Sequence, residues 1–348
     1  MLEFGEVKLK NLIIHKVGNS LQEEGIVIAQ KPLVFKEDIV KELLLKYFLS
    51  PFKGDVFYNF DHETDLNLNE LFCFCSEIFD DPDSFFIQSV NIAKHLYSKS
   101  NHHNIKGGEF YLVYFENVIV NNDVTDAIGL FKSENKETYL KVFHQEDSVE
   151  VEYEQGVNIN KLDKGCLIFN LEREKGYKLC IVDNTNKSQE AQYWKNDFLK
   201  IKQHQDNYFH TEHYLHMCKN FFSNALDEQY EVEKADKIML MNKSVNYFVK
   251  KESFNVREFE NEVMEQPELI EAFKNYKEEY KQKFDVPAYD EFEISDRAVK
   301  QTKKIFKSVI KLDKNFHIYI HGNRDYIQKG FDEERGLSYY QVFFKEES

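Results

Sequence analysis

The chain has 348 residues, with 45 Lys and Arg against 61 Asp and Glu and a formal net charge of −16. Hydrophobic residues make up 42% of the chain, and Gly and Pro number only 13 and 5, which excludes a disordered or fibrous protein. The acidic balance excludes a protein that coats DNA with its whole surface, because phosphate binding requires positive charge, which here can only be local.

The first hundred residues read as strands followed by three helices. Alternation of apolar and polar residues predicts strands in EVKLKNLIIHKV and GIVIAQKPLVF. A helix is predicted over 37–49 and a second over 68–79, where Asn67 and Glu70 have the spacing of a capping box. A third helix is predicted after Asp81, which is a good N-cap and precedes a proline. The apolar stripe expected on the first helix consists of Val40, Leu43, Leu44 and Phe48.

Six short segments rich in β-branched and aromatic residues follow between Gly108 and Asp183. Polar turns separate them at regular intervals, which predicts an antiparallel meander. The segments are EFYLVYFENVIV, DAIGLFKS, TYLKVFH, SVEVEYE, GCLIFNLE and YKLCIVDN.

The last part of the chain returns to helical spacing over 211–284, then reaches DVPAYDEFEIS, which we expect to be a loop or short strand, and ends in the strand-like YYQVFFKE. The fold class is therefore α+β, an antiparallel β-meander packed with helices, followed by a helical region and a C-terminal β-hairpin or short sheet. We expect residues 1–200 to form the domain with the sheet. Residues 201–348 form a helical region that ends in a basic helix or hairpin and C-terminal strands.

One basic stretch contrasts with the acidic chain, since 297–329 carries nine basic and two acidic residues. Ser295 can cap a helix that begins at Asp296, with an apolar stripe beside a row of lysines. FKSVIKL can equally begin a hairpin that turns at residues 313–315. In either form several lysines share one exposed edge, which suits contact with a phosphate backbone with little sequence preference. The alternative is that these lysines only solvate the element that carries them.

The residues expected to contact DNA belong to this stretch. Lysine rows favour backbone contact, because Arg, Asn and Gln are the usual readers of bases. An imidazole ordinarily has a pKa of about 6.5, so histidines on this edge predict stronger binding at mildly acid pH. The set is Arg297, Lys300, Lys303, Lys304, Lys307, Lys311, Lys314, His317, His321 and Arg324.

Metal and catalytic motifs give little support to an enzyme. His317 and His321 alternate with apolar residues as in a strand, where positions four apart are separated by roughly 13 Å, too far for one zinc ion. We expect the histidines of HTEHYLHMC to be solvent-exposed on a helix and not to bind a metal. The sequence contains no phosphate-loop or nucleophile motif. A metal-dependent nuclease remains an alternative, with carboxylates Asp126 and Glu134 and the nearby Lys136.

Five segments, in their order and spacing, resemble the bacterial nucleoid-associated protein family. They are NLIIHKVGN, DAIGLFKSENKETYLKV, KGCLIFN, EAQYWKNDFL and KSVIKLDKNFHIYIHGN, and the resemblance covers nearly the whole chain. It implies a cytoplasmic bacterial protein on the nucleoid that binds DNA without a catalytic step. It supplies no set of DNA-contact residues, so the site assignment depends on the charge distribution.

The sequence thus predicts a non-enzymatic protein, without cofactor or metal, that contacts double-stranded DNA directly or through a DNA-bound partner. In the second case, acidic helices over 226–293 would dock on a basic partner such as a DNA-handling protein. No apolar run approaches the ~18 residues of a membrane span, and the N-terminus lacks a signal-peptide pattern. The chain has five cysteines and no C-x-x-C pair, which fits a reducing cytoplasm. A homodimer would double the basic patch, although no heptad seam requires one.

Overall fold

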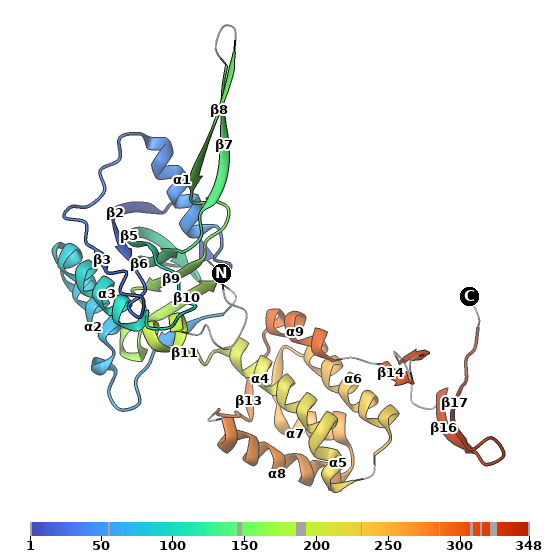
Figure 1. The fold of residues 1–348 in the computed structure, drawn as a ribbon. Helices are drawn as coiled ribbons and strands as arrows, with labels where there is room; N and C mark the ends of the chain where they lie inside the picture. The colour runs from blue at the N-terminus through green and yellow to red at the C-terminus, as the bar shows by residue number, and fades with distance from the viewer. Residues whose placement is uncertain are drawn as a thin grey trace. The chain divides into compact units, whose positions relative to one another are not determined.

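The computed structural model describes residues 2–54, 56–144, 148–185, 193–230, 232–284, 286–306, 309–313, 315–320 and 326–346. They divide into two compact units, unit 1 (Met1–His204) and unit 2 (Gln205–Ser348) (Figure 1). Within the described ranges, no helix is long and apolar enough to cross a membrane.

Unit 1 is built on one antiparallel sheet. Its described strands are β1 (Leu2–Glu3), β2 (Lys8–Val17), β3 (Ile26–Val27), β4 (Tyr58–Phe60), β5 (Gly108–Val120), β6 (Asp123–Ser133), β9 (Lys164–Phe169), β10 (Lys178–Asp183) and β11 (Ile201–Gln203). Their order across the sheet is β11-β4-β10-β9-β6-β5-β2-β3, and β1 pairs with the far end of β5. With helices on both faces, this confirms the predicted α+β class.

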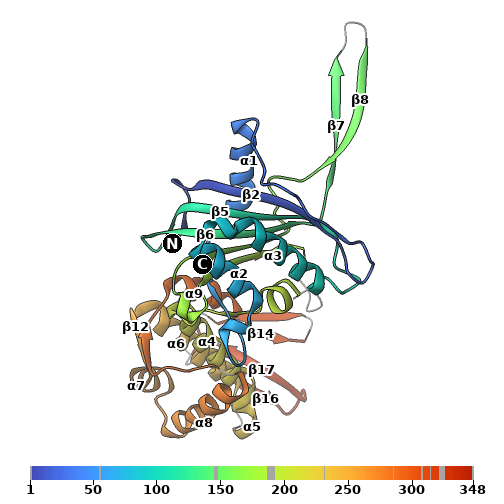
Figure 2. The ribbon, with the colours of Figure 1, turned by 90° about the vertical axis from the view of Figure 1, so that its left-hand side faces the viewer.

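The central strands of this sheet are buried on both faces, so alternate side chains enter two separate cores. Along β5, Leu112 packs into one core and Val113 into the other. Figure 2 shows α1 (Asp38–Leu49) on one side of β2, β5 and β6, and α2 (Glu70–Asp80) and α3 (Phe85–Lys99) on the other. A π-helical turn, Tyr193–Leu199, adds the fully buried Trp194 to the α2–α3 side.

The N-cap of α2 is Asn69, and the prediction that Asn67 caps this helix is wrong. Asn69 Oδ1 accepts a hydrogen bond from the Phe72 amide at 3.1 Å. Asn67 instead lies in a preceding 3₁₀ turn. Asn69 is favoured as the cap because its side-chain amide also donates to three carbonyls from two other segments, those of Asp61 and of Leu199 and Lys200, at 3.1 to 3.3 Å. The predicted cap Asp81 is confirmed, as it caps the 3₁₀ turn that leads into α3.

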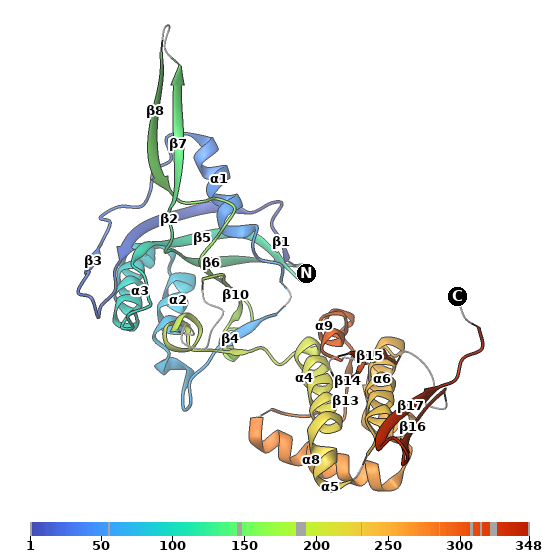
Figure 3. The ribbon, with the colours of Figure 1, turned by 45° about the vertical axis from the view of Figure 1, so that its right-hand side comes forward.

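The meander is interrupted by a hairpin that leaves the sheet. All six predicted strands are present, but β6 pairs directly with β9, and the two strands between them, β7 (Glu137–His144) and β8 (Val149–Gly156), pair only with each other. Figures 1 and 3 show this hairpin projecting from unit 1. Most of its side chains are exposed, whereas all six residues of β9 are buried.

The apolar stripe of α1 extends beyond the core that it covers. Phe48 is fully buried and Leu44 is half-buried, as the helical spacing predicts. Val40 and Leu43, one to two turns earlier on the same stripe, are exposed, which differs from the prediction. The helix therefore packs on the sheet only through its C-terminal half.

Unit 2 is mainly helical. Its described helices are α4 (Asn207–Asn220), α5 (Leu226–Gln229), α6 (Lys234–Lys250), α7 (Val256–Phe259), α8 (Pro267–Phe284) and α9 (Asp296–Thr302). Three strand pairs accompany them, namely β12 (Ser253–Asn255) with β13 (Glu291–Glu293), β14 (Val309–Leu312) with β15 (Phe316–Tyr319), and β16 (Ile327–Asp332) with β17 (Leu337–Val342).

The main core of unit 2 is aromatic. Phe254 of β12 lies between Phe248 and Phe292, with ring centroids 5.4 and 4.8 Å away. These rings pack against Phe259 and Phe273 from the following helices. A second, smaller core joins Ile238 of α6 to apolar residues of the C-terminal strands, Ile310, Ile320 and Ile327.

Candidate nucleic-acid interface

The helix α9 presents one basic face because its other face is buried. Ser295 is its N-cap, as predicted, and accepts from the Ala298 amide at 3.4 Å. Ala298, Val299 and Thr302 are buried, and α9 packs on α4 and α6. Four of the six exposed positions of the helix and the following turn are basic, namely Arg297, Lys300, Lys303 and Lys304, and the other two are Asp296 and Gln301.

The helix ends at Thr302, so the basic stretch is not one continuous helical row. A 3₁₀ turn, Lys303–Ile305, follows, and Phe306 has extended backbone angles. The segment then forms the hairpin β14–β15, which is the second of the two forms that the sequence allows. Two consecutive β-branched residues, Val309 and Ile310, favour a strand here.

The hairpin β14–β15 has one buried and one exposed face. Ile310 pairs with Ile318 on the face that packs toward Ile238 of α6. Lys311 pairs with His317 on the opposite face, and both side chains are exposed. Lys311 and His317 are thus brought together across the hairpin.

The lysines of α9, the following turn and β14 differ in their ion pairing from several other lysines of unit 2. Among the described residues, Lys300, Lys303, Lys304 and Lys311 form no ion pair with Asp or Glu. Six other lysines of unit 2 are ion-paired, namely Lys237, Lys243, Lys251, Lys274, Lys277 and Lys281. Among the described residues, six more have no ion pair with Asp or Glu, namely Lys219, Lys234, Lys250, Lys283, Lys329 and Lys345. The four lysines of α9, the following turn and β14 thus keep a positive charge that no ion pair cancels, and they follow one another within twelve positions of the chain.

Four residues of the predicted set lie outside the described part of the chain, namely Lys307, Lys314, His321 and Arg324. The structure therefore places six of the ten, which are Arg297, Lys300, Lys303, Lys304, Lys311 and His317.

The histidines of α4 are not the solvent-exposed set that the sequence predicts. His210, His213 and His216 are half-buried, and the ring of His213 stacks on Phe209 with centroids 4.0 Å apart. Burial lowers the pKa of His213 to about 4, with a further contribution from its histidine neighbours. The described residues contain no group of three or more His, Cys, Asp or Glu side chains placed to hold a metal ion.

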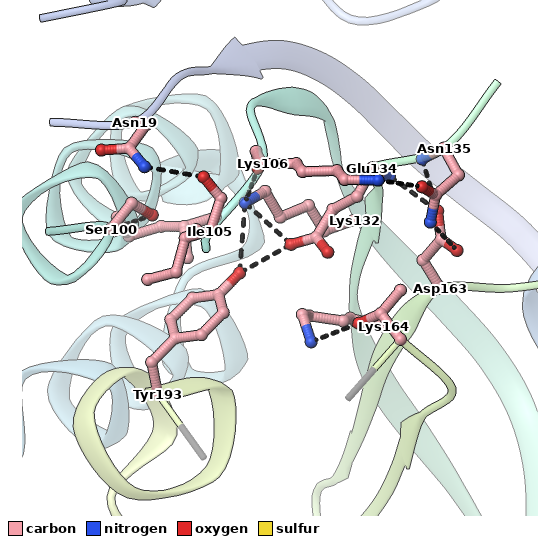
Figure 4. A network of polar contacts seen from close by, with 12 residues as sticks. Asn19, Ser100, Ile105, Lys106, Lys132, Glu134, Asn135, Asp163, Lys164 and Tyr193 are labelled. Carbon is pink, nitrogen blue, oxygen red and sulfur yellow. Dashed lines mark hydrogen bonds and ion pairs between the residues drawn. The ribbon is translucent and has the colours of Figure 1, made fainter. Parts of the chain in front are cut away.

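A buried polar network at the end of β6 was not predicted from the sequence (Figure 4). Lys132, completely buried, donates to the carbonyl of Lys106 at 2.7 Å and lies 3.1 Å from both Glu134 and the hydroxyl of Tyr193. Tyr193 in turn donates to Glu134 at 2.8 Å. Burial lowers the pKa of Lys132 and raises that of Tyr193, while Glu134 opposes the shift of the lysine.

A second buried lysine, Lys164, lies on the neighbouring strand β9. It binds both carboxylate oxygens of Asp183 at 2.9 Å and the hydroxyl of Thr185 at 2.7 Å. The only signal in the sequence was that Lys132 and Lys164 interrupt otherwise apolar strands.

A family model described as nucleoid-associated protein YejK (NA37) matches residues 13–335 of the chain. The chain belongs to this nucleoid-associated protein family. The match confirms the resemblance seen in the sequence and supports a nucleoid-associated role. No curated protein matches the chain.

The nuclease alternative for this nucleoid-associated protein is not supported by the positions of its two carboxylates. Asp126 and Glu134 lie near opposite ends of β6, so they are separated by roughly 26 Å at the usual rise of a strand. Asp126 accepts from the hydroxyl of Tyr114 at 2.8 Å, and Glu134 is engaged by Lys132. One metal ion cannot be shared by groups so far apart.

Proposed function

We propose that this chain is a non-catalytic nucleoid-associated protein that contacts the phosphates of duplex DNA through the basic surface of α9 and β14. The surface comprises Arg297, Lys300, Lys303, Lys304 and Lys311, with His317 beside it. On sequence grounds the set also includes Lys307, Lys314, His321 and Arg324. The observation that carries the proposal is that four exposed lysines without ion-pair partners gather on α9, the following turn and β14, whereas other unpaired lysines of the described residues, such as Lys219, Lys250 and Lys283, lie on separate helices.

The chemistry of this surface favours backbone contact over base recognition. Lysine is a flexible point charge that binds phosphate oxygens without the fixed geometry needed to distinguish bases. Four exposed lysines on two adjoining elements would each release a counterion from the duplex. Family membership supports the location on the nucleoid, and the acidic remainder of the chain would keep binding confined to this surface.

A salt titration with a random-sequence duplex tests the proposal. If all four lysines contact phosphates, the slope of log affinity against log salt should be near −4, at about −0.9 per contact. A variant with Lys300, Lys303, Lys304 and Lys311 changed to Ala should flatten the slope by about 3 to 4. The matched control changes Lys31, Lys36, Lys94 and Lys161 to Ala, which removes the same charge from exposed positions of unit 1.

The control separates a local site from a general effect of net charge. Equal losses in both variants would contradict a defined DNA-binding surface. A wild-type chain that fails to bind the duplex even at low salt would contradict direct contact. The alternative would then be favoured, in which the acidic helices within 226–293 dock on a DNA-bound partner.

A further inference from the structure

The projecting hairpin β7–β8 has one face that is apolar and uncharged. Side chains alternate between the faces of a strand, and the register pairs Leu140 with Tyr153 and Val142 with Val151. Thr138 and Gln155 at the base and His144 near the tip complete that face, which carries no Asp, Glu, Lys or Arg among the described residues. Its apolar side chains are 52% to 72% exposed, and they are Leu140, Val142, Val149, Val151 and Tyr153.

The opposite face of the hairpin is acidic, which restricts what can cover the apolar one. It carries Glu150, Glu152 and Glu154, with Lys141 ion-paired to Glu154. Phosphate groups of DNA or of an anionic membrane would be repelled by this charge. An isolated two-stranded hairpin is only marginally stable, and exposed apolar patches of this kind mark protein interfaces. The expected occupant is therefore a protein.

A second unpartnered apolar surface lies at the same end of unit 1. It is the N-terminal half of α1, where Ile39, Val40 and Leu43 are 52%, 42% and 37% exposed. Leu33 and Val34, just before the helix, are exposed as well. Figures 1, 2 and 3 all show this end of α1 and the hairpin projecting from the same end of unit 1.

We infer that the hairpin is a dimerisation arm, whose apolar face packs on the exposed half of α1 in a second copy of this chain. One unit carries both an arm and a surface to receive an arm, which is what a two-fold, self-complementary interface requires. Neither apolar surface includes a charged side chain that would repel its counterpart. The inference concerns unit 1 and does not depend on DNA binding by unit 2.

The area available favours reciprocal exchange over contact between the two arms alone. Each contact joins ten exposed apolar side chains, five of the arm and five around the start of α1, and at roughly 50 Å² of accessible surface each they would bury about 500 Å². Two arms packed face to face would bury about 500 Å², below the ~1,000 Å² of a specific interface. Two arms, each on the α1 of the other copy, bury about twice as much and reach that value.

Sedimentation equilibrium of the full chain tests this arrangement. Wild type should be a dimer at about 50 µM, above the micromolar dissociation constants of weak interfaces. Val142→Lys on the arm and Ile39→Lys on α1 should each weaken dimerisation by about 100-fold or more, because an unpaired ammonium would be buried twice per dimer. Phe143→Lys, one residue away on the other face, and Glu42→Lys, on an exposed polar position of α1, should leave the dimer intact.

Mixing the two monomeric variants distinguishes exchange from other dimers. A Val142→Lys chain keeps its α1 surface, and an Ile39→Lys chain keeps its arm, so a heterodimer regains one of the two contacts. The mixture should therefore associate more tightly than either variant alone and more weakly than wild type, because it regains about half of the wild-type contact area. A monomeric wild type, an unaffected Val142→Lys dimer or a mixture that associates no more tightly than either variant alone would overturn the inference. A monomeric wild type would leave the arm to a different protein.

Discussion

The buried pair Lys132–Glu134 makes the sharpest prediction about stability. Glu134→Gln keeps the shape of the side chain but removes the charge opposite an ammonium, where the side chains are 0% and 4% exposed. Two neutral acceptors would remain, the Lys106 carbonyl and the Tyr193 hydroxyl. Breaking a buried ion pair from one side costs about 3–5 kcal/mol. Deprotonating a lysine of ordinary pKa at pH 7 costs about 4.6 kcal/mol, which sets a ceiling. We therefore expect a loss of about 3–4 kcal/mol in the free energy of unfolding.

The single tryptophan makes this loss measurable in unit 1 alone. Trp194 is fully buried next to Tyr193, so its fluorescence during urea unfolding reports on this unit. The loss in the free energy of unfolding of Glu134→Gln should become smaller as pH rises toward 10. At that pH Lys132 also loses its proton in the unfolded chain, so folding with a neutral Lys132 no longer costs free energy. Lys132→Met combined with Glu134→Gln should recover part of the loss by removing the unpaired ammonium.

The matched control is Glu154→Gln, which breaks the exposed pair with Lys141 on β7–β8 and should leave the urea midpoint unchanged. A loss below about 1 kcal/mol for Glu134→Gln would refute the reasoning, since it would mean that Lys132 is not held as a buried cation.

Three further predictions concern a cap, a turn and a titrating group. Asn69→Ala should cost unit 1 about 2 kcal/mol, while Asn67→Ala should cost almost nothing in the same tryptophan assay, and equal losses would contradict the assigned cap. Gly176→Ala should be destabilising by more than about 1 kcal/mol, because φ is +90° and a Cβ would lie 2.3 Å from the Phe60 carbonyl oxygen. The pKa of His213 is lowered to about 4, so the unfolded chain binds more protons and stability should fall as pH drops from 6.5 to 4. His213→Gln should reduce this fall by about 1–2 kcal/mol, discounted for partial exposure, in urea unfolding followed by helical circular dichroism. An unchanged pH dependence would contradict the assignment.

Local chemistry made much of the fold predictable. The six strands between Gly108 and Asp183 are runs of β-branched and aromatic residues bounded by polar turns, and each lies where it was expected. Asp81 and Ser295 are caps because a short polar side chain meets free amides a few residues away. These features depend on contacts within about one turn of chain.

Other features of the fold depend on contacts between segments that are far apart in the sequence. The direct pairing of β6 with β9, the shift of the cap to Asn69 and the burial of Lys132 all depend on segments distant in the sequence. A lysine is ordinarily exposed. Glu134 lies only two residues from Lys132, but the tertiary arrangement alone places Tyr193 and the Lys106 carbonyl where they compensate its burial.

The candidate site shows the same division. The sequence by itself determined that positive charge concentrates in 297–329, because net charge over a short segment does not depend on folding. The tertiary structure decided whether these basic side chains are exposed and whether they form ion pairs. Packing of Ile310 toward α6 turns the segment into a hairpin and exposes Lys311, while several carboxylates of unit 2 pair with other lysines. Ion pairing depends on distances between side chains of separate elements, and only the folded chain sets those distances.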